Sequence, residues 1–238
     1  MEPGIVHQAI KWPEVPAIGM GPINLHPPQW THEDRYSGQA VLPHMFIGPY
    51  HLVRNLEFIQ QHGIEYVLCI RDPSERLFLR ETALPGVEFC FLDVPADVNK
   101  TSIIPHFGQA NQLIRQITGQ GKTILLCCSD GIDKSASFLT AYLMNTYSLA
   151  AVDAITFVQN RRYCATPSPY GYRLKLMEYE LICSAEKSSA AQQLSPGGGG
   201  SGDPKCSRRR EDDDENMGED QGSESRTIAT AFSCKRAR

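Results

Sequence analysis

One short segment has the residue types and the spacing for cysteine chemistry on an anion. It runs Cys128-Ser129-Asp130-Gly131-Ile132-Asp133-Lys134-Ser135, after an apolar run at 123–127 that is typical of a buried strand. Helical periodicity begins at Ser135. A cysteine just before a helix meets free backbone N–H groups and the helix dipole, which stabilise a thiolate and can hold an anion. The segment therefore predicts a reactive thiolate beside an anion site.

Other residues of the segment fit the same chemistry. Gly131 permits a tight turn, and the spacing Cys-x5-Lys-Ser places a cation on the far side of the loop with a hydroxyl directly after it. This spacing differs at one residue from that of the loop of a cysteine-dependent phosphatase. Two other interpretations stay open. Cys128 could be a small buried apolar residue, and Cys127 and Cys128 could form a redox pair, although a disulfide between neighbours strains the backbone.

The elements around this segment alternate between strand and helix. Short apolar runs predict strands, and apolar residues repeating every three or four positions predict helices. Such an alternation predicts an α/β fold with a central, mostly parallel sheet and helices on both faces, and in such folds function gathers at the carboxyl ends of the strands. The predicted strands are 46–48, 66–70, 87–94 and 123–127, and the predicted helices are 52–62, 103–117, 135–147, 151–161 and 172–183.

The two ends of the chain differ in composition from its middle. The 238 residues are 41% hydrophobic and 21% charged with a net charge of −4, which fits a globular protein and not a strongly basic nucleic-acid binder. We expect an irregular or disordered lead-in over 1–40, one domain over 41–191, and a disordered Gly/Ser and charged tail over 192–238. The basic runs at 208–210 and 235–238 fit a nuclear-import or nucleic-acid patch, but a solvated charge run is the simpler interpretation.

The sequence also predicts the setting in which the chain works. It contains no apolar block of the length that spans a membrane or forms a signal peptide, so we expect a cytoplasmic and nuclear protein. Its eight cysteines lack C-x-x-C spacing. We therefore expect reduced thiols with neither a disulfide framework nor a zinc site, and we expect no metal or organic cofactor.

Over about residues 41–183 the chain resembles the dual-specificity protein phosphatases. Their signature is His-Cys-x5-Arg-Ser/Thr between a strand and a helix, and the segment 127–135 matches it with two replacements. Within that family the chain is most similar to a pseudophosphatase, and a charged tail after a Gly/Ser stretch adds to the likeness. The other matching segments are 41–48, 61–71, 92–93 with Asp97, 158–164, 167–170 and 176–180.

This resemblance implies a role for each residue of the candidate site. Cys128 stands at the position of the nucleophile, Asp97 at that of the general acid, Lys134 at that of the phosphate-binding arginine, and Ser135 at that of the hydroxyl that assists the leaving thiolate. Asp93 competes for the general-acid position, and Asp97 could instead be a loop or helix-capping residue. The residues that would surround a bound phosphate are Cys128, Ser129, Asp130, Gly131, Ile132, Asp133 and Lys134.

Three departures from the signature predict a loss of activity. Lys134 stands where the signature has an arginine. The planar guanidinium of an arginine binds two phosphate oxygens, whereas the lysine ammonium is a flexible point charge. Asp130 and Asp133 place two carboxylates in a loop meant for a dianion. If they face inward, each like-charge pair costs about 2–3 kcal/mol at an effective dielectric of about 20. Cys127 stands at the histidine position, so the Cys128 thiolate should be scarcer.

These features predict a catalytically inactive or severely impaired phosphatase-like protein that binds signalling proteins. The alternative is a weak cysteine-dependent protein tyrosine/serine/threonine phosphatase, and a redox sensor that uses Cys128 is a third class. The resemblance implies protein partners, including phosphoproteins such as MAP kinases and components of ubiquitin ligases. Arg161 and Arg162 would ordinarily be solvated at a helix end, and the resemblance makes them candidates for domain packing or partner contact.

Overall fold

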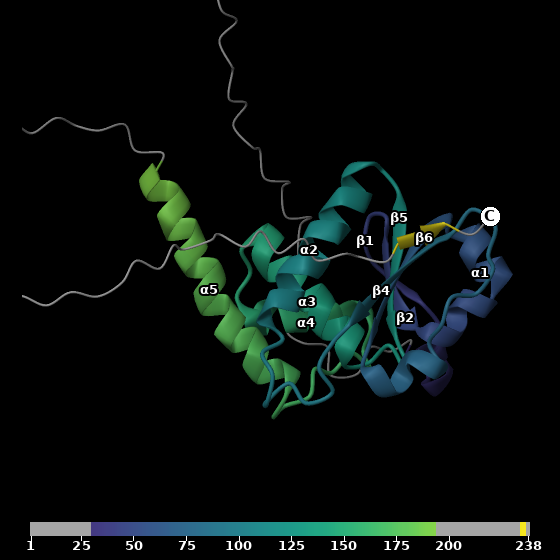
Figure 1. The fold of residues 1–238 in the computed structure, drawn as a ribbon, viewed down its shortest axis with the longest axis horizontal. Helices are drawn as coiled ribbons and strands as arrows, with labels where there is room; N and C mark the ends of the chain where they lie inside the picture. The colour runs from purple at the N-terminus through teal and green to yellow at the C-terminus, as the bar shows by residue number, and fades with distance from the viewer. Residues whose placement is uncertain (1–29, 194–233, 237–238) are drawn as a thin grey trace, which may run out of the picture.

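A mixed sheet forms the centre of the computed structural model, which describes residues 30–193 and 234–236 (Figure 1). The three central pairings, β2 with β5, β5 with β3, and β3 with β4, are parallel, and the outer pairings at each edge are antiparallel. The six strands follow the order β1-β2-β5-β3-β4-β6. Their bounds are β1 (Gln39–Leu42), β2 (Met45–Pro49), β3 (Ile64–Arg71), β4 (Glu88–Asp93), β5 (Thr123–Cys128) and β6 (Cys234–Arg236).

Helices cover both faces of this sheet, as the alternating pattern predicts. The four larger helices lie together on one side of it, and α1 (Leu56–Gln61) lies on the other (Figure 1). The larger helices are α2 (Ile104–Gly119), α3 (Lys134–Tyr147), α4 (Ala151–Arg161) and α5 (Tyr172–Gln193). Three 3-10 helices complete the described elements: η1 (His32–Tyr36), η2 (Tyr50–Arg54) and η3 (Pro73–Leu77).

Strand β5 is buried on both faces, which explains its unbroken apolar sequence. Its residues alternate between two hydrophobic clusters, since Ile124 and Leu126 belong to the cluster under α2 to α5 while Leu125 and Cys127 belong to the cluster on the α1 side. A strand between two other parallel strands needs apolar residues at every position. The central strand therefore holds Cys128, its last residue, at a fixed place at the carboxyl edge of the sheet.

Two segments differ from the elements that the sequence predicts. The predicted helix at 52–62 is divided into η2 and α1 at Asn55, whose side chain accepts a hydrogen bond from the Phe58 N–H at 3.1 Å and caps α1. The predicted lead-in over 1–40 is too long, because η1 and the start of β1 lie within it. Pairing with β2 and hydrogen bonds from Arg162 order residues 35–39, and neither leaves a periodic pattern in the sequence.

The predicted tail over 192–238 lies mostly outside the described residues. Within it, α5 continues to Gln193, and β6 pairs with β4 in the register Glu88↔Arg236 and Cys90↔Cys234. A three-residue strand amid a charged, Gly-rich sequence carries no recognisable β pattern of its own. No helix in the described part of the chain is long and apolar enough to cross a membrane.

The expectation that all cysteines are reduced is wrong for Cys90. Cys90 is disulfide-bonded, whereas Cys69, Cys127, Cys128, Cys164 and Cys183 are free. Strand pairing between distant segments brings cysteines together without any short spacing in the sequence. The absence of C-x-x-C pairs therefore could not reveal this bond.

Candidate active site

The loop between β5 and α3 lies at the carboxyl edge of the parallel strands, where the sequence places it. Gly131 at its centre has a φ of 69°, in the left-handed region. A Cβ atom at this position would lie 2.3 Å from the carbonyl carbon of Gly48 and 2.5 Å from the nitrogen of Pro49. Glycine is thus required both for the turn and for the close approach of the loop to the end of β2.

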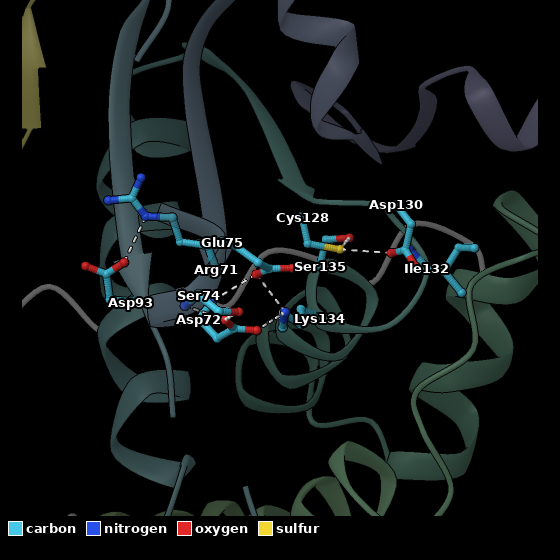
Figure 2. Close-up of polar contacts among 10 residues, drawn as sticks. All are labelled: Arg71, Asp72, Ser74, Glu75, Asp93, Cys128, Asp130, Ile132, Lys134 and Ser135. Carbon is cyan, nitrogen blue, oxygen red and sulfur yellow. Dashed lines mark hydrogen bonds and ion pairs between the residues drawn. The ribbon is translucent and has the colours of Figure 1, made fainter. Parts of the chain in front are cut away.

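The Cys128 thiol lies inside this loop, in contact with two of the predicted site residues (Figure 2). Its Sγ is 3.3 Å from the Ser135 Oγ and donates to the Asp130 Oδ1 at 3.4 Å. Burial and the negative charge of Asp130 raise the pKa of Cys128, and the hydrogen bonds from Ser135 and the Gly131 N–H offset this only in part. The thiol is therefore protonated at neutral pH, unlike an activated nucleophile.

Cys127 does not form a redox pair with Cys128. The two residues follow each other in β5, so their side chains point to opposite faces, and Cys127 lies in the apolar cluster on the α1 side. Burial raises the pKa of Cys127 well above its ordinary value. A histidine at this position would have to enter a fully buried apolar environment.

The carboxylate of Asp130 is turned into the loop. Its Oδ1 accepts a hydrogen bond from the Ile132 N–H at 2.9 Å in addition to the one from the Cys128 thiol (Figure 2). A backbone N–H group that could bind an incoming anion is thus occupied by a carboxylate of the chain itself. This is the inward orientation for which the sequence argument expects a repulsive cost.

Asp133 has a different, structural role. Its Oδ1 accepts a hydrogen bond from the Ser168 N–H at 2.9 Å, and this contact joins the loop to the segment between α4 and α5. Burial raises the pKa of Asp133, although the hydrogen bonds from Ser168 oppose this shift. Asp133 therefore holds the loop in place, and its carboxylate is already engaged outside the loop.

Lys134 is held by two carboxylates from the other side of the site. Its Nζ is 2.9 Å from the Asp72 Oδ2 and 2.7 Å from the Glu75 Oε2, and all three side chains are largely buried (Figure 2). We call Asp72 and Glu75 the carboxylate clamp. Burial of Lys134 lowers its pKa, but the hydrogen bonds to Glu75 and Asp72 outweigh burial and raise it. Two of the three ammonium protons are thus already bound, whereas an arginine would bring five donors.

The two carboxylates of the clamp are themselves fixed by the start of η3. The Asp72 Oδ1 accepts hydrogen bonds from the Ser74 N–H at 2.9 Å and from its hydroxyl, while the Glu75 Oε2 accepts one from the Asp72 N–H at 2.9 Å. Burial opposes the charge on Asp72, yet the hydrogen bonds from Ser74 and Lys134 lower its pKa to about 2. This reciprocal arrangement is a capping box.

The two candidates for the general acid are engaged elsewhere. Asp97 is half-exposed, and its Oδ1 accepts hydrogen bonds from the Asn99 N–H at 3.0 Å and the Lys100 N–H at 3.4 Å. These contacts, led by the one from Asn99, lower the pKa of Asp97, whereas a general acid needs a raised one. Asp93 is ion-paired with Arg71 at 2.8 Å and Arg76 at 3.1 Å. The structure thus brings neither carboxylate into hydrogen-bond contact with Cys128.

Arg162 supports the loop from behind, a role that the sequence suggests only as domain packing. Its guanidinium is fully buried and donates at 2.8 Å to the carbonyl oxygens of Gly131, Ser37 and Arg35, and it also bonds the side chain of Gln39. Because the Gly131 carbonyl points toward Arg162, the adjacent Ile132 N–H points into the loop. The neighbouring Arg161 instead lies over the Phe157 ring, with its Cζ 3.6 Å from the ring centroid.

A cysteine loop between a parallel strand and a helix, supported by a buried arginine, defines a phosphatase-like domain. The family model "Dual specificity phosphatase, catalytic domain" matches residues 45–182. The chain belongs to the dual specificity phosphatase family.

Named relatives and solved structures agree with this assignment. The chain is 34% identical to the human serine/threonine/tyrosine-interacting protein over 160 residues, 66% of this chain and 71% of the relative. The crystal structure of that human protein matches with a TM-score of 0.56 and covers 61% of this chain and 96% of its own. Mouse dual specificity protein phosphatase 22 is 27% identical over 141 residues, 59% of this chain and 72% of the relative. A mouse dual specificity phosphatase solved with zinc tungstate matches at 25% identity with a TM-score of 0.54, covering 64% of this chain and 91% of its own.

Proposed function

We propose that the chain is a pseudophosphatase, a phosphatase-like domain without useful catalysis that binds signalling proteins. The observation that carries this proposal is the state of the three groups that catalysis needs. The cation Lys134 is bound to Asp72 and Glu75, and the nucleophile Cys128 is a protonated thiol against Asp130. The half-exposed Asp97 is engaged with its own turn.

The charge around the loop also opposes phosphate binding. Three carboxylates, those of Asp72, Glu75 and Asp130, stand against the one ammonium of Lys134. A phosphate monoester brings up to two negative charges. Each like-charge pair about 6 Å apart costs about 2–3 kcal/mol at an effective dielectric of about 20. An oxyanion would therefore meet net repulsion where an active phosphatase offers attraction.

Protein binding is supported by the family likeness and by the surface. The name of the human relative describes an interacting protein. At the end of η3, next to the carboxylate clamp in the sequence, Leu77 and Phe78 are 79% and 74% exposed and offer a partner two adjacent apolar side chains. We propose phosphoproteins such as MAP kinases and components of ubiquitin ligases as partners, and the cytoplasm and nucleus as the location.

Turnover of an aryl phosphate by the purified full chain tests the catalytic part of the proposal. We expect no rate above that of a Cys128→Ser control, or one at least about a thousandfold below an active relative, because loss of one preorganised charge-stabilising group already costs about 10²–10³ in rate. Robust turnover that Cys128→Ser abolishes would contradict the proposal.

Titration of a purified MAP kinase tests the binding part. We expect saturable binding to the full chain, followed by calorimetry, that Cys128→Ser leaves unchanged because the thiol takes no part in it. A Leu77→Ser/Phe78→Ser variant should weaken that binding, and a surface control, Glu178→Gln, should not. Absence of saturable binding to any signalling protein of these classes would contradict this part of the proposal.

A weak phosphatase is the second candidate, and one contact favours it. The Cys128 Sγ and Ser135 Oγ lie 3.3 Å apart, so the hydroxyl that would assist the leaving thiolate is in place. In that mechanism Cys128 attacks phosphorus, Asp97 protonates the leaving oxygen and Lys134 compensates part of the charge. The same turnover assay separates the two candidates.

A further inference from the structure

The carboxylate clamp holds Lys134 in the way that a bound oxyanion would. Asp72 and Glu75 contact the ammonium at 2.9 and 2.7 Å, the distances of charge-assisted hydrogen bonds. Both carboxylates come from the start of η3, which lies beyond β3 and outside the loop. The cation at the start of α3 thus has its anionic partners, but another part of the same chain provides them.

A second group near this place lacks a partner. Tyr172 at the start of α5 is only 5% exposed, and its hydroxyl makes no hydrogen bond within the described residues. Burial raises the pKa of Tyr172, and the negative charges of Asp133, Glu75 and Asp72 raise it further. The start of α5 is joined to the loop through Ser168, whose hydroxyl accepts a hydrogen bond from the Tyr172 N–H at 3.2 Å and whose N–H donates to the Asp133 Oδ1 at 2.9 Å. A buried hydroxyl without an acceptor still has its proton available for a hydrogen bond to a ligand.

We propose that the domain contains a latent oxyanion site, formed by Lys134 and the Tyr172 hydroxyl, which Asp72 and Glu75 keep closed. The ligand class is a tetrahedral oxyanion such as a phosphate monoester. The inference rests on the proposed function, because it explains how a phosphatase fold excludes phosphate. It adds that η3 provides two of the carboxylates that exclude phosphate, and that Tyr172 belongs to the site.

Anion binding by the purified full chain tests this inference, with sodium tungstate as the probe and inorganic phosphate as a second one. The test variant is Asp72→Asn/Glu75→Gln, since both new amides still offer an oxygen to the N–H groups that fix η3. Its matched control is Glu178→Gln, which removes a carboxylate from the surface ion pair with Lys175. Calorimetry measures affinity, and circular dichroism shows that each variant is folded.

We expect the double variant to bind tungstate at least about tenfold more tightly than the natural chain, because a full charge removed a few ångströms away is worth at least that at an effective dielectric of about 20. Glu178→Gln should change nothing. Adding Lys134→Met to the double variant should abolish the gain. Adding Tyr172→Phe should weaken binding by about tenfold, the usual loss of one hydrogen bond to a charged group.

Each alternative result has a defined meaning. A folded double variant that binds tungstate no better than the natural chain overturns the inference. If the increase in tungstate affinity is unchanged by Tyr172→Phe, Tyr172 is not part of the site. If the increase is unchanged by Lys134→Met, Lys134 is not part of the site. Gained binding without turnover leaves the pseudophosphatase proposal intact. Turnover by the natural chain contradicts that proposal, and the tungstate affinities of the variants then decide whether Asp72 and Glu75 still restrict the site.

Discussion

At the scale of single residues, two neighbouring aspartates of one loop have opposite roles. Asp130 turns inward to the thiol and the Ile132 N–H, while Asp133 turns outward to the Ser168 N–H. Their residue type is the same and their spacing is short. Between them lies Gly131, whose left-handed φ of 69° turns the backbone. Sequence reasoning therefore identified both carboxylates but could not assign their directions.

Removal of the Asp130 charge should make Cys128 more reactive. In Asp130→Asn the thiol loses its neighbouring negative charge, so its pKa should fall, and its alkylation by iodoacetamide at pH 7 should be faster by about tenfold for each unit of pKa. Mass spectrometry of the alkylated peptides measures this rate, and buried Cys183 in the same sample provides the control. An unchanged rate at Cys128 would show that Asp130 does not govern the thiol.

Asp72 should make the stability of the domain depend on acid pH. Its pKa is lowered from 3.8 to about 2 in the folded chain, so its contribution is present above about pH 4 and is lost as the pH falls toward 2. Urea unfolding at pH 5 and pH 3 measures the difference in unfolding free energy between the natural chain and Asp72→Asn. We expect this difference to be smaller at pH 3 than at pH 5. In a Lys134→Met background the effect of Asp72→Asn should be much reduced. A difference that is constant with pH would argue against the ion pair.

At the scale of elements, the loop depends on supports that lie far from it in the sequence. Lys134 meets η3, Asp133 meets the segment after α4, and Arg162 connects the loop to the segment before β1. Apolar periodicity predicts the four central strands and the larger helices, because burial acts repeatedly along the whole length of such an element. Single polar contacts between distant segments leave no such repeat. The sequence therefore predicted β5, α3 and Cys128 with Ser135, but neither the carboxylate clamp nor the partners of Arg162.

Replacement of Arg162 should destabilise the domain strongly. In Arg162→Met the carbonyl oxygens of Gly131, Ser37 and Arg35 lose their donor while they remain buried, and the free energy of unfolding should fall by about 3–5 kcal/mol. Arg161→Met is the matched control at the same helix end, where loss of the contact with Phe157 should cost about 1 kcal/mol or less. Urea denaturation measures both variants. Equal losses of unfolding free energy in the two variants would mean that Arg162 does not support the loop.

The general acid shows a limit of reasoning from resemblance. Asp97 occupies the expected segment after β4, yet its contacts with the N–H groups of Asn99 and Lys100 are those of a loop residue, the alternative that the sequence left open. Spacing along the chain places a residue in a loop, but it does not say which way a loop carboxylate turns. The same holds for Asp93, whose partners Arg71 and Arg76 lie on β3 and η3.

At the scale of the whole molecule, the tail should contribute little to stability. Only the short strand β6 joins the sheet in the described part beyond residue 193, and it pairs with the outer strand β4 (Figure 1). Truncation after Gln193 under reducing conditions should shift the melting temperature by no more than about 2 °C, because changes away from a core cost about 0.5 kcal/mol.

Hydrogen exchange should still detect that loss, since the β4 amides that face β6 become exposed. The melting and exchange measurements use the same pair of proteins. A fall of 5 °C or more in the melting temperature would mean that the tail is a stabilising part of the domain.

The contacts of Arg162 also decide where a working fragment of this protein can begin. A fragment cut at residue 41, where the hydrophobic pattern starts, would lack Arg35, Ser37 and Gln39, three of the groups to which the guanidinium donates. The cut would leave the buried Arg162 guanidinium, which donates to the Gly131 carbonyl, without these acceptors. An expression fragment should therefore begin before Arg35, because a start at residue 41 would remove groups that hold the support of the loop in place.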